Sequence, residues 1–210
     1  MMKLSQIQAL HSGMLGDVAS LQGTLDRLNG NIIGIKSDNS RHDSYIAEKV
    51  DEARKAALPQ MGDLLGTFGG RLETVQAQRK FWESKELILS MQTFANDPAQ
   101  DATIRLGKIA EFAAMPARLL QLVGDSAKED NNYALLFVAF IAGHDRAGQP
   151  GWRGIDLSDV AVPEQTEALQ LIKQSEALAM RASDIVALAS GGGLTPVRKL
   201  QTARALNAGG

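Results

Sequence analysis

The sequence predicts an all-α protein, in which an N-terminal coiled-coil arm is followed by a helical bundle with one long loop. Three observations lead to this fold class. A heptad repeat runs through the first 35 residues, and apolar residues recur at helical spacing in most later segments. The 210 residues are 44% hydrophobic and only 5% aromatic, so the core is aliphatic. We expect a heptad-bearing arm over residues 1–58 and the bundle over residues 59–210.

Two series of residues, each spaced by seven, define the seam of the first helix, as its a and d positions. Nine of the ten positions are aliphatic, and the tenth, His11, is a polar residue of the kind that sets register or oligomeric state. Glycines at 16, 23 and 30 each cost about 1 kcal/mol relative to alanine, so this helix needs a partner. We predict an oligomer interface along the seam; the alternative is a bundle helix that buries the seam within the chain. The a series is Leu4, His11, Val18, Leu25 and Ile32, and the d series is Ile7, Met14, Leu21, Leu28 and Ile35.

The middle of the chain predicts three further helices. The first covers about 43–58 and ends before Pro59, because a residue that precedes proline is pushed out of the helical region. Glycines at 62, 66 and 70 favour a glycine-rich connector or a kinked short helix; the alternative is the close helix packing that small residues at this spacing allow in lipid. A long helix is expected over about 71–95. Another follows over about 100–123, which Pro116 must kink or split.

The last third of the chain holds an apolar run, a loop and a long helix. Residues 133–142 form a short apolar run, and the helical patterns of the adjoining segments favour a buried helix over a strand. Residues 143–163 form a long loop, and loops of this length tend to be functional or to contact partners. Trp152 and Arg153 are candidate partner contacts, since tryptophan and arginine are enriched at binding hot spots; alternatively, Trp152 packs its own loop down. A helix over 163–190 should stop at the glycines 191–193.

A short basic helix is expected at the C-terminus, with Thr195 as its N-cap and proline in its first turn. It carries Arg198, Lys199 and Arg204 and no acidic residue. These cations could contact phosphates or an acidic surface of a neighbouring subunit, or they could be solvated. The whole chain has a net charge of −2, so nucleic acid could be contacted only through this helix.

The residues that usually carry chemistry are sparse. The chain has no cysteine, which excludes disulfides, thiolate catalysis and cysteine-bound metal. His11, His42 and His144 lack the spacing of a metal site. Two of these histidines precede an aspartate, but adjacent side chains point apart on a helix and do not make a dyad. We therefore predict no catalytic, cofactor-binding or metal-binding residue, no cofactor, and a protein that is not an enzyme.

One fifteen-residue stretch, SRHDSYIAEKVDEAR over residues 40–54, resembles a segment of small helical structural proteins of tailed bacteriophages. Tyr45 and Ile46 open its charged helix, which ends in Glu-Ala-Arg. The resemblance implies a virion or assembly component. The moderate charge content, 22%, departs from that of highly charged scaffolding proteins.

The heptad seam and the lack of a catalytic constellation favour one function. We expect a non-enzymatic structural or assembly subunit of a phage particle or similar complex, whose partners are itself and other assembly subunits. The longest apolar run, residues 133–142, is too short for a membrane span, and no signal peptide is recognised. We expect a protein that is cytoplasmic at synthesis and then part of a particle. The alternatives are a filament or secretion-apparatus subunit, and a helical enzyme or ligand binder that uses the 143–163 loop.

Overall fold

The structure is a computed structural model that describes residues 2–38 and 41–192. These residues are helical throughout their regular structure and form no strand, which confirms the predicted all-α class. The chain divides into two compact units. The first combines Met1–Arg79 with Glu167–Gly210, and the second is Lys80–Thr166. This division differs from the expected boundary at residue 58, because a helix runs through that position and a C-terminal helix returns to the first unit.

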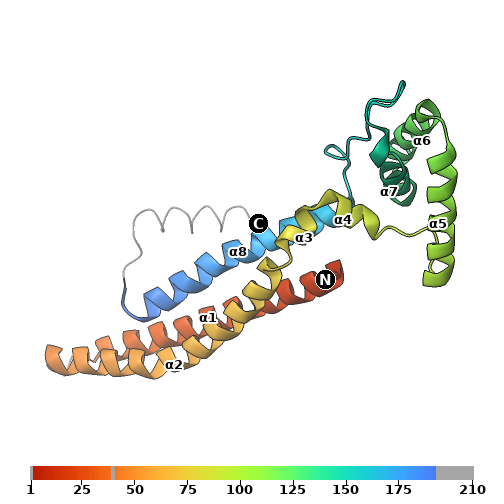
Figure 1. The fold of residues 1–210 in the computed structure, drawn as a ribbon. Helices are drawn as coiled ribbons and strands as arrows, with labels where there is room; N and C mark the ends of the chain where they lie inside the picture. The colour runs from red at the N-terminus through yellow and green to blue at the C-terminus, as the bar shows by residue number, and fades with distance from the viewer. Residues whose placement is uncertain (1, 39–40, 193–210) are drawn as a thin grey trace. The chain divides into compact units, whose positions relative to one another are not determined.

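Three long helices build the first unit: α1 (Leu4–Lys36), α2 (Asp43–Gln76) and the part of α8 (Pro163–Ala189) that follows Thr166. Figure 1 shows α1 and α2 as an antiparallel hairpin with α8 alongside. Ion pairs link elements of this unit. Arg71 of α2 contacts Asp17 of α1 at 2.5 Å, and Arg79, three residues after the end of α2, contacts Glu176 of α8 at 2.7 Å.

The helix α2 continues through Pro59, so the expected end of this helix at residue 58 is wrong. A proline inside a helix leaves the carbonyl four residues earlier without its amide donor. Here both Pro59 and Lys55 are exposed, so water can hydrate that carbonyl. The expected glycine-rich connector is likewise part of α2. Gly62, Gly66 and Gly70 are exposed, and a methyl group at any of them would meet no atom within 4 Å.

The helix expected over 71–95 is instead broken into three pieces. α2 ends at Gln76, and two short helices follow, α3 (Arg79–Glu83) and α4 (Lys85–Ser90). Ser84 starts α4 as its N-cap, since its hydroxyl accepts a hydrogen bond from the amide of Leu87 at 3.4 Å. This local capping interaction competes with helix continuation, and the apolar periodicity of the segment did not reveal it.

The second unit is centred on three helices and a turn: α5 (Pro98–Ala114), α6 (Ala117–Glu129), α7 (Tyr133–Ala142) and η1 (His144–Arg146). Pro116 splits α5 from α6, as predicted, with the preceding Met115 in extended conformation. The apolar run 133–142 is the buried helix that its neighbours favoured. The core cluster of this unit consists of Phe112, Leu120, Val138 and Ala139.

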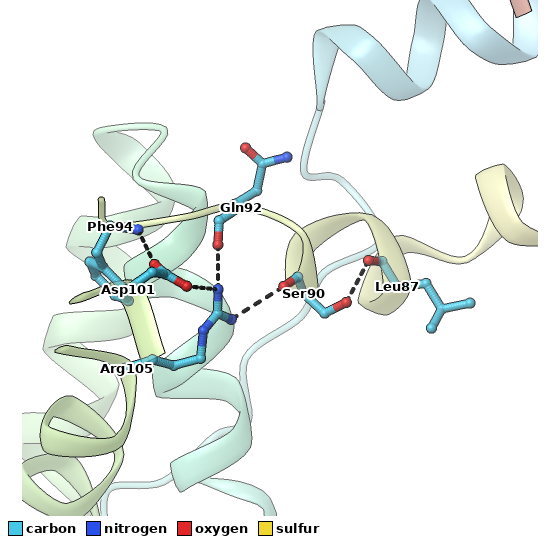
Figure 2. A network of polar contacts seen from close by, with 6 residues as sticks. All are labelled: Leu87, Ser90, Gln92, Phe94, Asp101 and Arg105. Carbon is cyan, nitrogen blue, oxygen red and sulfur yellow. Dashed lines mark hydrogen bonds and ion pairs between the residues drawn. The ribbon is translucent and has the colours of Figure 1, made fainter. Parts of the chain in front are cut away.

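A polar network ties the segment after α4 to α5 (Figure 2). The guanidinium group of Arg105 donates to the carbonyls of Ser90 and Gln92, at 3.3 and 2.6 Å, and to the carboxylate of Asp101 at 3.3 Å. The other oxygen of Asp101 accepts from the amide of Phe94 at 2.6 Å. This amide and then the guanidinium group of Arg105 lower the pKa of Asp101. The network satisfies backbone groups that no helix or sheet pairs.

Candidate functional site

The seam of α1 is buried inside the first unit. Six of its ten side chains are at most 5% exposed, and the other four are half-buried. Within the same chain, α2 packs along α1, and α8 contacts α1 through Glu167 and Ser175. A bundle helix that buries its seam within the chain, the alternative given above, therefore accounts for this burial. Association of two chains through the seam remains a prediction. The six buried residues are Ile7, Met14, Val18, Leu21, Leu25 and Leu28, and the half-buried ones are Leu4, His11, Ile32 and Ile35.

His11 faces α8 from its a position. Its Nδ1 atom lies 3.0 Å from the hydroxyl oxygen of Ser175, which is fully buried. Burial lowers the pKa of His11 from its ordinary value of 6.5. The neutral imidazole is thus the form that fits the contact between α1 and α8. One helical turn away, Gln8 donates to the carboxylate of Glu167 at 2.6 Å, so polar contacts fix the register of these two helices.

The loop after η1 is held against the second unit by Trp152, which is half-buried against the core cluster. A methyl group at Gly143 would lie 2.1 Å from the indole ring of Trp152, so only glycine allows the ring this position. In the same way, a methyl group at Gly124 would lie 2.6 Å from Ile155. The geometry is that of a loop packed down by its own tryptophan.

Arg153, the second predicted contact in this loop, remains at the surface. Its amide donates to the side-chain oxygen of Gln121 at 3.0 Å, and its guanidinium group pairs with Asp125 at 2.7 Å. The side chain is 76% exposed, so it is available to a partner. The remaining predicted contacts, Arg198, Lys199 and Arg204, lie outside the described residues.

Arg146 is a buried cation that the sequence analysis missed. It is 8% exposed, and its guanidinium group donates to the carbonyls of Phe112, Ala113 and Met115, with distances of 3.0 and 2.7 Å for the first two. These carbonyls end α5, where helix carbonyls lack intrahelical donors and carry partial negative charge. Arg146 therefore stabilises the end of α5. Nothing in the local pattern distinguished it from a surface arginine.

An open pocket of about 350 Å³ lies in the second unit beside the 143–163 loop. Its polar groups are largely engaged within the protein. The ammonium group of Lys85 donates to the carbonyl of Val160, and the amide of Ser158 donates to Asp156 at 2.9 Å and lowers its pKa. The volume is at the lower end of the range of small-molecule sites. The lining consists of Ser84, Lys85, Glu86, Phe140, Ile155, Asp156, Leu157 and Ser158.

The described part of the chain shows neither a metal site nor a membrane span. Among residues 2–38 and 41–192, no three histidine or carboxylate side chains gather where they could hold a metal ion. None of the helices in these ranges combines the length and the apolar character that crossing a membrane requires.

Comparison with known proteins adds no assignment. The chain matches no protein-family model, no curated protein and no solved structure.

Proposed function

We propose that this chain is a non-enzymatic structural or assembly subunit of a multi-subunit particle, of the kind found in tailed phages. The observation that carries the proposal is an apolar surface on the second unit. On α6, Leu119 and Leu122 are 51% and 57% exposed, and Leu106 of α5 is 68% exposed. Large apolar side chains that are left exposed on one helix face favour a contact with another protein, since their burial is favourable.

The spacing of the two α6 leucines supports this proposal. Leu119 and Leu122 are three residues apart, so they lie on one face of the helix. The opposite face of α6 is buried through Leu120 and Ala127. The helix therefore has one apolar face for its own core and a smaller one directed outward, as a subunit that contacts neighbours requires.

The resemblance over residues 40–54 supports the phage version of the proposal. In this segment Tyr45 is 38% exposed, and two cations lie over its ring: Arg41 at 4.8 Å and Lys49 at 5.7 Å from the centroid. The cations hold an amphipathic aromatic side chain at the surface, where it can contact another subunit.

The proposal is tested by sedimentation velocity on the full chain over a wide concentration range. We expect species heavier than the 22.5 kDa monomer. Replacing Leu119 and Leu122 together by serine should reduce the association and leave the melting temperature nearly unchanged, because both side chains are largely exposed. Leu87→Ser, at a 46% exposed position on α4, is the matched control. A chain that is monomeric at every concentration would contradict the proposal.

A ligand-binding function is the second candidate, and the open pocket beside the 143–163 loop favours it. Four of its eight lining residues come from that loop. Thermal unfolding with a library of small polar molecules tests this function. A saturable rise of the melting temperature would support ligand binding. If no compound stabilises the chain, the assembly role is the one candidate function that remains.

A further inference from the structure

The outer face of α1 is the exposed side of this helix, opposite the a and d positions of the seam. Six of its nine residues from position 16 to position 34 are small and exposed, namely Gly16, Ala19, Ser20, Gly23, Gly30 and Gly34. A methyl group added at any of the four glycines would meet no atom within 4 Å. The described residues of the first unit therefore give no packing reason for glycine here, although each glycine destabilises the helix by about 1 kcal/mol relative to alanine.

One large apolar side chain, Ile33, interrupts this small-residue surface. It is 68% exposed, which is as high as any large apolar residue in the described part of the chain. On the same helix, the seam residues Leu21 and Leu28 are 0% and 4% exposed. Among the described residues, Ile33 therefore has no hole to pack into, and the small residues at 16–23 form a hole that no side chain fills.

The charges on the outer face are an adjacent, opposite pair. Asp26 and Arg27 are its exposed charged residues between positions 16 and 34, and neither forms an ion pair with the described residues. Asp26 accepts only from Gln22, at 2.9 Å, and Arg27 donates to Gly23 and Thr24. A face with one charge of each sign has no net charge to attract a strongly charged partner. It can, however, complement a copy of itself.

We propose that the outer face of α1 pairs with the same face of a second copy of this chain, with the two helices antiparallel about a twofold axis between Asp26 and Arg27. This inference rests on the proposed assembly role and names its first contact. In this pairing each Asp26 faces Arg27 of the second copy, so the charges form two reciprocal ion pairs. Such self-complementary contacts are the rule in twofold dimers.

The same twofold axis places Ile33 over the small residues of the second copy. Residue 33 lies opposite residue 20 of the second copy, so Ile33 enters the space between Gly16, Ala19, Ser20 and Gly23. These four positions have the spacing of the hole that receives a knob in helix pairs. Gly30 then lies opposite Gly23, and two glycines at a contact allow the helix axes to approach closely. One arrangement thus satisfies both the charges and the shape.

Light scattering and sedimentation on the full chain test this pairing. Asp26→Arg places two cations opposite each other and should weaken the dimer at least about tenfold. Combining it with Arg27→Asp exchanges the two charges and should restore the dimer. Gly23→Leu fills the hole and should abolish the dimer without unfolding the monomer. Gly62→Leu, an equally open glycine on α2, is the matched control and should change nothing.

Disulfide trapping gives a second measurement, since the chain has no cysteine of its own. Ser20→Cys combined with Ile33→Cys should form cross-linked dimers on mild oxidation. Ile33→Cys alone should not, because the two copies of this residue lie about 20 Å apart along antiparallel helices. Cross-linking of the single variant as fast as the double one would overturn the antiparallel arrangement.

The outcomes separate this inference from the proposed function. If the wild type associates and the α1 variants leave its mass unchanged, the pairing is refuted, while the assembly role stands on the α6 surface. If the wild type stops at a dimer that the α1 variants dissociate, and the α6 variants change nothing, the pairing is supported and the α6 surface is not part of an assembly. A wild type that is monomeric, together with a Ser20→Cys, Ile33→Cys variant that forms no cross-link, refutes both.

Discussion

The stability of the first unit should depend strongly on Leu21, which is fully buried at the middle of α1. Leu21→Ala removes three carbon atoms, worth about 0.8 kcal/mol each, or ~2.4 kcal/mol of burial free energy. The void that remains adds about 24 cal/mol for each Å³ that the neighbouring side chains fail to fill. We therefore expect a loss of about 3–4 kcal/mol in the free energy of unfolding.

Urea unfolding followed by far-UV circular dichroism measures this loss. Leu15→Ala is the matched control, because Leu15 lies on the same helix and is 47% exposed. Because the Leu15 side chain is about half exposed, its truncation loses only about half of the burial free energy and leaves no void. We therefore expect a loss of only ~1 kcal/mol in the free energy of unfolding. Equal losses of stability in the two variants would show that the seam is not the buried core of α1.

Three further predictions concern single side chains. Gly143→Ala should destabilise the protein by about 1–3 kcal/mol, because the added methyl group displaces the ring of Trp152, and thermal unfolding with tryptophan fluorescence measures both effects. Arg146→Met keeps the volume but leaves the carbonyls at the end of α5 without donors, so urea unfolding should show a loss of about 1–3 kcal/mol. Burial lowers the pKa of His11 in the folded state. The folded state therefore resists protonation, and stability that is fully present above pH 6.5 should be lost as the pH falls through the folded-state pKa.

Each of these predictions has a control and a contradictory result. Gly107→Ala, on the exposed side of α5, should stabilise by about 0.5–1 kcal/mol, so equal losses at 107 and 143 would speak against the Trp152 contact. Arg153→Met should change stability by less than about 1 kcal/mol, since its ion pair is exposed. For the pH series, His11→Gln should flatten the acid side of the stability profile. An unchanged profile would assign that slope to other groups.

Several elements of the fold could be predicted from local patterns. The seam repeat identified the buried face of α1, Pro116 separated α5 from α6, and the apolar run 133–142 is the central helix of the second unit. Each of these depends on periodicity or on the backbone geometry of proline, which act within a few residues. The candidate contacts were less predictable: Trp152 packs on its own unit, and the buried Arg146 carried no local signal.

By itself, the sequence determined the helical class and which face of each long helix is apolar, because spacing along one helix decides which side chains share a face. Only the tertiary structure decided what covers those faces. α8 returns over more than 150 residues of chain to lie on α1, where Ser175 meets His11, and no local pattern encodes such a pairing. The continuation of α2 through Pro59 was decided in the same way. A proline ends a helix when its orphaned carbonyl is buried and can be tolerated when that carbonyl faces water, and the packing of the whole unit sets which applies.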